Sequence, residues 1–207
     1  MSGVALAMLG AVSQGVLWGL MVLGVYITYK ILDIADLTVD GSFALGGCVC
    51  AAMIANKGMN PVLAIFIALL AGLAAGAVTG FLHTVFDIPA ILSGILTQIA
   101  LYSINLNIMD RHANQALSID KYDLIISSRQ LDHAIIVGVV FAIVLIALLY
   151  WYFGTEQGSA IRATGCNPAM SKAQGINIDT MKLIGLALSN GIVALSGGLL
   201  SQYSGFS

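Results

Sequence analysis

Five long runs of this chain contain no Asp, Glu, Lys or Arg, and they constrain its fold more than any other feature. They are residues 1–29, 58–82, 88–109, 134–155 and 183–207. Each run approaches or exceeds the ~20 residues with which an α-helix crosses the ~30 Å hydrocarbon layer of a bilayer. A sixth uncharged run, residues 41–56, is shorter. The runs predict an all-α polytopic membrane protein.

The composition excludes the soluble alternatives. Charged residues make up 9% of the chain and hydrophobic residues 59%, whereas a soluble domain carries roughly 25% charged residues. The first run lacks a basic segment and is longer than the ~7–15 apolar residues of a signal peptide, so we interpret it as a retained helix. The net charge of −2 gives no reason to expect a nucleic-acid partner.

We expect one domain, residues 1–207, folded as a helical bundle of about six membrane segments. The predicted segments are residues 4–29, 41–56, 61–82, 89–109, 134–153 and 181 onward. The second of them is predicted to be short or discontinuous. In the third, Gly72, Gly76 and Gly80 recur at every fourth residue. Such a stripe of small residues lets helix backbones approach closely in lipid, so we expect it to be a packing face.

A polar island, residues 154–182, separates two of the apolar runs. Within it Asn167 is a good N-cap, Pro168 suits the first helical turn, and Gly175 suits the residue after the helix. These residues predict a short helix over residues 168–174. A capped helix on the surface of a membrane protein is typical of a docking element.

The distribution of basic residues predicts the orientation of the chain. The island carries Arg162, Lys172 and Lys182 against two acidic residues, whereas residues 110–133 carry three basic and four acidic residues. The positive-inside bias therefore favours a cytoplasmic island, an extracytoplasmic 110–133 loop and an N-terminus on the outer side.

Acidic and small polar residues gather at the start of the short second segment, in the stretch DIADLTVDGSFALGG. Irregular backbone at membrane depth is tolerated only against protein or a water-filled cavity. One interpretation places these residues on a translocation path; the other has the acids cap helices at the level of the lipid headgroups. The path candidates are Asp36, Thr38, Asp40, Gly41 and Ser42.

The sequence lacks four common motifs of nucleotide-binding and catalytic sites. The chain has no GxxxxGK[ST], HExxH, GxSxG or CxxC pattern, so its sequence supports neither nucleotide hydrolysis nor metal or serine catalysis. We therefore expect no enzyme activity, no metal site and no cofactor on this chain.

Three stretches resemble the permease subunits of the ABC importers that carry branched-chain amino acids, ribose and related solutes. They are DLTVDGSFALGG, GSAIRATGCNPAMSKAQGIN and LALSNGIVALSGGLLSQYSGF, and they lie in the family's order within a matching hydropathy frame. The amino-acid sequences of these stretches most resemble a sub-branch of the family linked to aromatic or other amino acids. Sugar and nucleoside carriers share the same frame.

The resemblance implies that the island is a cytoplasmic loop coupling the permease to a separate ATPase. The matching positions are Gly158, Arg162, Ala163, Gly165, Asn167 and Gly175. Within the short helix we expect Pro168 to begin the element, Met170 to supply an apolar contact and Lys172 a peripheral charge.

The resemblance also implies partners. These are an ATP-binding subunit holding ATP and Mg, an external solute-binding protein and a second permease copy in a homodimer. Family members continue through further spans, so the chain is expected to correspond to about the first two thirds of a permease. Two alternatives stay open: an ion-coupled transporter or channel using Asp36 and Asp40, and a membrane scaffold that transports nothing.

Overall fold

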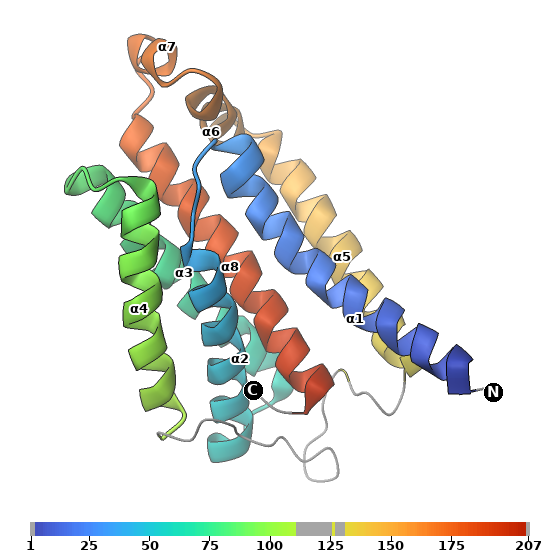
Figure 1. The fold of residues 1–207 in the computed structure, drawn as a ribbon. Coiled ribbons are helices and arrows are strands. Elements are labelled where there is room, and N and C mark those ends of the chain that lie inside the picture. Colours follow the sequence, from blue (N-terminus) through green and yellow to red (C-terminus); the bar gives the residue numbers. More distant parts are fainter. Residues whose placement is uncertain (1–2, 111–125, 127–130, 206–207) are drawn as a thin grey trace.

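The computed structural model describes residues 3–110, 126 and 131–205, and every regular element in those residues is helical (Figure 1). The elements are α1 (Gly3–Tyr26), a π-helical turn η1 (Ile27–Ile31), α2 (Thr38–Lys57), α3 (Pro61–Val85), α4 (Ala90–Ile108), α5 (Leu131–Phe153), α6 (Glu156–Cys166), α7 (Pro168–Ala173) and α8 (Ile178–Ser204). In the described part, six helices are long and apolar enough to cross a membrane. The predicted all-α bundle of six membrane segments is confirmed.

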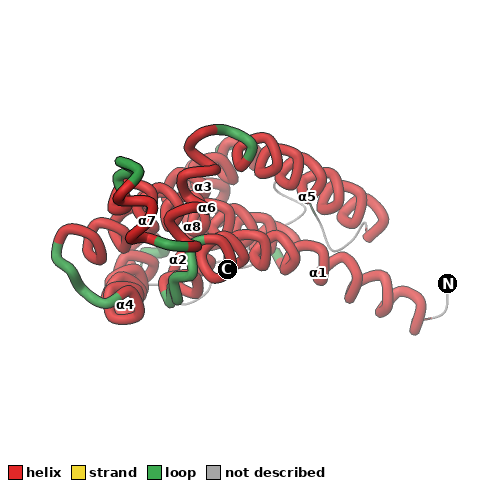
Figure 2. The backbone as a smooth tube through the Cα atoms, turned by 90° about the horizontal axis from the view of Figure 1, so that it is seen from above, coloured by secondary structure: helices red, strands yellow, loops and turns green. Residues whose placement is uncertain are grey.

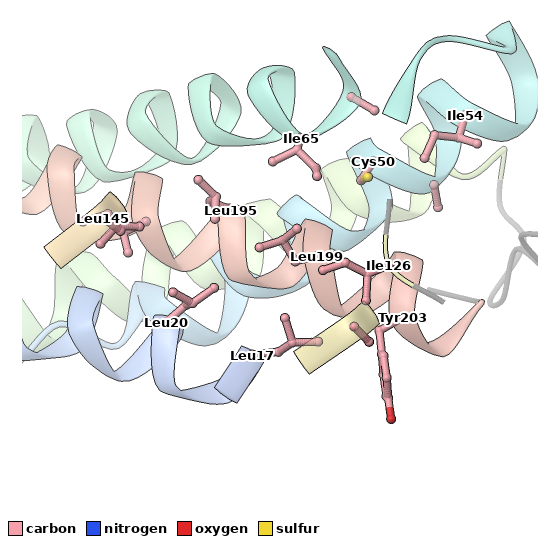
Figure 3. Close-up of a cluster of buried hydrophobic side chains, with 14 of the residues drawn as sticks. Leu17, Leu20, Cys50, Ile54, Ile65, Ile126, Leu145, Leu195, Leu199 and Tyr203 are labelled. Carbon is pink, nitrogen blue, oxygen red and sulfur yellow. The ribbon is translucent and has the colours of Figure 1, made fainter. Parts of the chain in front are cut away.

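Helix α8 is the centre of the bundle. It packs along α3, α2 and α1, and nearly all of its residues from Gly185 to Tyr203 are buried. Viewed from above, α4 and the α1–α5 pair lie on opposite sides of α8 (Figure 2). A close-up shows Leu195 and Leu199 of α8 among Leu17, Leu20 and Ile65 from neighbouring helices (Figure 3).

The glycine stripe of α3 faces α8. A Cβ atom added at Gly72 would meet Ala194 and the carbonyl oxygen of Asn190, and one at Gly76 would meet the carbonyl oxygen of Leu186. One at Gly80 would lie 2.9 Å from the Cα atom of Leu183. All three residues are buried. The absence of side chains therefore sets the distance between these two helices.

Helix α2 differs from its prediction. It begins at Thr38, three residues before the predicted start, and runs for 20 residues without a break. The helix is therefore neither short nor discontinuous, which corrects the expectation. The cause is Asp36, whose Oδ1 accepts the backbone N–H of Thr38 at 2.8 Å and so allows the first turn to form ahead of Asp40.

The irregular backbone lies before α2, in residues 32–37. This segment runs down between helices, so that α2 starts beside the middle of α8 rather than at its end (Figure 1). Its first backbone amides are paired, since Leu32 N–H donates to Ile27 O and Ile34 N–H to Thr28 O, each at 3.0 Å. Such pairing is required of extended backbone at membrane depth.

Of the predicted 110–133 loop, residues 111–125 and 127–130 lie outside the described residues. The C-terminal end of α4 lies at the end of the bundle opposite α6 and α7 (Figure 1). Helix α5 begins at Leu131, so the last three residues of the predicted loop are helical.

Candidate functional site

Five polar side chains join the start of α2 to α3 and α8. We call them the polar cluster: Asp36, Thr38, Ser42, Thr79 and Asn190. Asn190 Nδ2 donates to Asp36 Oδ2 at 2.7 Å, and Ser42 Oγ donates to Asn190 Oδ1 at 2.6 Å. The hydroxyls of Thr38 and Thr79 are 2.9 Å apart. These bonds join residues up to 154 positions apart in the sequence.

Asn190 is the centre of the polar cluster. Its side chain is fully buried, and its Nδ2 also donates to Leu186 O at 3.0 Å. Both amide hydrogens and the amide oxygen therefore have partners inside the protein. Because an orphaned polar group in this setting costs several kcal/mol, the complete pairing specifies one arrangement of α2 against α8.

Three features hold Asp36 in place. Its carboxylate faces the N-terminus of α2, where the helix dipole favours a negative charge. On the α4 side Gly94 allows a close approach, since a Cβ there would lie 2.9 Å from Leu37 N and 3.4 Å from Asp36 Oδ1. Both carboxylate oxygens accept hydrogen bonds from protein groups, the second donor being Asn190.

The structure brings three of the five path candidates together and leaves two apart. Asp36, Thr38 and Ser42 belong to the polar cluster, and Thr38 and Ser42 are buried. Gly41 is buried against α4, with Gln98 Cα 3.2 Å from where a Cβ would stand. Asp40 is exposed. Sequence reasoning assigned no role to Thr79 or Asn190, although Asn190 interrupts an uncharged apolar run.

The island forms two helices, of which only the second was predicted. Helix α6 begins after Thr155, whose Oγ1 accepts Gly158 N–H at 3.4 Å. Its buried face comprises Gly158, Ile161 and Thr164. A Cβ at Gly158 would meet the backbone of Phe153, and one at Gly165 would meet the carbonyl oxygen of Ile31. Helix α6 thus rests directly on the backbone of α5 and η1.

Helix α7 has the predicted caps and ends one residue before the predicted end. Asn167 Oδ1 accepts Met170 N–H at 3.0 Å, and Pro168 is the first helical residue. Gly175 has a φ of 84°, a conformation that glycine adopts readily. Ile176 N–H returns to Ser171 O at 3.0 Å. The short helix is therefore closed at both ends.

The nine predicted coupling residues separate into three groups. Gly158, Arg162, Ala163 and Gly165 belong to α6; Asn167 and Gly175 close α7; Pro168, Met170 and Lys172 are exposed on α7. Arg162 is exposed but bonded within the chain, since its Nη2 donates to Phe153 O at the end of α5 at 2.9 Å. Met170 is 58% exposed and is the large apolar side chain that α7 presents.

No group of three or more His, Cys, Asp or Glu side chains that could hold a metal ion occurs among the described residues. The free thiols differ in access, because Cys48 and Cys50 are buried whereas Cys166 is exposed.

Comparison with known proteins identifies the family. The family described as "branched-chain amino acid transport system / permease component" matches residues 7–207. The chain belongs to this permease family. It is therefore a permease component of an ABC transport system and a multi-pass protein of the cell membrane, and it is a transport component rather than an enzyme.

Three relatives of the permease illustrate the range of the family. A tyrosine transport system permease protein of Clostridioides difficile is 41% identical over 207 residues, which are 100% of this chain and 67% of that protein. An uncharacterised protein of Rickettsia prowazekii is 32% identical over 196 residues, 95% of this chain and 68% of the relative. A ribose import permease protein of Haemophilus influenzae is 26% identical over 187 residues, 87% of this chain and 57% of the relative. No solved structure gives a significant match.

Proposed function

We propose that this permease is the membrane subunit of an ABC importer for an amino acid or similar small solute, and that the α6–α7 pair couples it to a separate ATPase. The observation that carries the proposal is α7, a helix closed at both ends and exposed beyond the bundle. Family membership and the tyrosine transport relative support the solute class. In this proposal ATP and Mg are bound by the partner subunit.

The contacts of α6 suggest how a movement of α7 would travel. Gly165 rests against Ile31 and Leu32, and Arg162 is bonded to Phe153. Residue 32 begins the segment that leads within five residues to Asp36 and the polar cluster. A displacement of α7 would therefore be transmitted to the start of α2 through a short series of closely packed residues.

Replacement of Met170 by Glu is expected to weaken ATPase binding about tenfold or more. The change removes an exposed apolar contact, and burying the new carboxylate at an interface without a partner costs more than the roughly 1.4 kcal/mol of a tenfold change. The affinity of the purified ATPase for the reconstituted permease measures the effect.

The matched control is Asn107→Glu, which adds the same charge at an exposed position near the opposite end of the bundle. It is expected to leave ATPase binding unchanged. Equal weakening by both variants would show a general charge effect, and an unchanged affinity in the Met170→Glu variant would remove α7 from the interface.

The orientation can be tested with a native thiol. Because Cys166 is exposed and next to the start of α7 while Cys48 and Cys50 are buried, a membrane-impermeant maleimide is expected to label Cys166 alone. Labelling should occur in inside-out vesicles and be absent in right-side-out vesicles. A Cys166→Ser variant, expected to remain unlabelled in both, is the control. Labelling from the outer side would reverse the proposed topology and contradict the coupling role.

The remaining partners complete the proposal. An external solute-binding protein would deliver the solute at the end of the bundle opposite α7, and a second copy of the permease would complete the path. The groove between α2 and α8, about 280 Å³ and lined by small residues such as Gly47, Cys48 and Gly197, is a surface of this chain that could line the path.

No observation favours the ion-coupled alternative over the importer. That alternative uses Asp36 and Asp40 as ion ligands, but Asp36 already accepts hydrogen bonds at both oxygens, and Asp40 is exposed outside the polar cluster. Transport that persists when ATP is removed but stops when the ion gradient is collapsed would support the alternative.

A further inference from the structure

A groove of about 580 Å³ lies between α1 and α5 and is completed by residues of η1 and α6. Figure 1 shows α6 at one end of the α1–α5 pair. We call this groove the α1–α5 groove. Its lining is mostly apolar and includes Leu23, Tyr26, Ile146, Leu149, Tyr150 and Arg162.

The side chains around the groove are those typical of the part of a membrane where hydrocarbon gives way to headgroups. Both helices expose apolar side chains along their outer faces, Val22 and Ile143 among them. At the α6 end the exposed side chains become aromatic, with Tyr26 at 55%, Tyr150 at 85% and Trp151 at 70% exposure. Tyrosine and tryptophan concentrate at the level of the headgroups.

Among the residues that the structure describes, Arg162 is the one charged residue that lines the groove. Within the described part of the chain its guanidinium donates one hydrogen bond, to Phe153 O, whereas a guanidinium carries five N–H donors. The planar donor array of arginine matches the oxygens of a phosphate group in a bidentate arrangement. The groove thus combines a cation at its polar end with a long apolar wall.

We propose that the α1–α5 groove binds an anionic phospholipid, with the headgroup phosphate on Arg162 and an acyl chain along α1 and α5. The occupant follows from complementarity of charge and polarity: an amphiphile with a negative head matches both ends of the groove. An apolar helix from a second copy would cover the wall but leave the guanidinium donors of Arg162 without acceptors. The bound lipid would join α6 to the α1–α5 pair from outside.

The test uses a tryptophan reporter in the groove. Trp18→Phe and Trp151→Phe remove both tryptophans of the 207-residue chain, and Tyr26→Trp places a single reporter in it. The protein is reconstituted in phosphatidylcholine vesicles that contain equal fractions of phosphatidylglycerol, with bromine on the acyl chains of one lipid or the other. Brominated phosphatidylglycerol is expected to occupy the site about fivefold more than brominated phosphatidylcholine, the ratio typical of one basic residue near an anionic lipid.

Variants then assign the preference. Arg162→Gln is expected to abolish it, Arg162→Lys to retain part of it, and Lys172→Gln on α7, outside the groove, to leave it intact. Equal quenching by both lipids in the parent protein would overturn the proposal. So would the absence of quenching by either lipid, which would show that protein covers the groove, or a preference that survives in Arg162→Gln. The comparison of the two brominated lipids in the protein with Arg162 intact needs no variant of that residue. It therefore tests the proposal even if the Arg162 variants do not fold.

Discussion

Gly76→Val is expected to destabilise the helical bundle strongly. A Cβ at this position would meet the carbonyl oxygen of Leu186 and would lie 2.8 Å from both Ala187 Cα and Asn190 Cβ. Backbone cannot move aside as a flexible side chain can, so α3 and α8 would have to separate along the most extensive helix pair of the bundle. Overpacking commonly costs about 1–3 kcal/mol and occasionally more; contact with backbone places this case at the upper end.

Gly19→Val in α1 is the matched control, because nothing lies within 4 Å of where its Cβ would stand. Both substitutions replace a mid-helix glycine by the same β-branched residue, so their intrinsic effects on helix formation are alike. The measurement is the monodisperse, folded fraction after solubilisation in mild detergent, with the thermal unfolding midpoint. If the two variants unfolded at the same temperature, close packing at Gly76 would not determine the stability of the bundle.

Asp36→Ala is expected to give the second large loss, in both stability and transport. The substitution removes the acceptor of Thr38 N–H and of Asn190 Nδ2, and each orphaned donor costs about 1–3 kcal/mol. Asp40→Ala, at an exposed acid in the first turn of α2, is expected to cost under about 0.5 kcal/mol. The free energy of unfolding in detergent and solute uptake by vesicles measure the two effects.

A reciprocal exchange tests whether the loss arises from this pair. In the double variant Asp36→Asn with Asn190→Asp, an amide at position 36 can still accept Thr38 N–H and can donate to a carboxylate at position 190. The double variant should therefore be more stable than the sum of the single changes by about 0.5–3 kcal/mol, the range for residues in one network. Strict additivity, or an Asp40→Ala loss equal to that of Asp36→Ala, would contradict the assigned role of the polar cluster.

The membrane segments could be predicted because freedom from charge over a sufficient length is a property of each segment by itself. The start of α2 could not. Asp36 and Asp40 are each followed two residues later by a hydroxyl residue, Thr38 and Ser42, so the local pattern permits either acid to begin the helix. The choice depends on Asn190, which donates to Asp36 from 154 residues away. A prediction from neighbouring residues alone cannot include that contact.

Helix α6 was missed for a related reason. Gly158 and Gly165 lower the intrinsic tendency of this stretch to form a helix, so no helix was predicted there. In the folded chain these glycines allow α6 to rest on the backbone of Phe153 and Ile31. Tertiary packing therefore outweighs local preference here. Helix α7 was predictable because Asn167, Pro168 and Gly175 act within a single short stretch.

The central position of α8 has a consequence for the order in which the protein is made. Helices α1, α2 and α3 all pack on α8, yet α8 is the last of the six candidate spans to leave the ribosome. About 150 residues separate the end of α2 from the end of α8, which at ~5–20 residues per second corresponds to on the order of ten seconds. During that interval the glycine stripe of α3 and the carboxylate of Asp36 lack their partners. Packing of these six helices is therefore complete only once α8 has been made, and the α8-facing surfaces of α2 and α3 are most exposed to quality-control proteases just before it arrives.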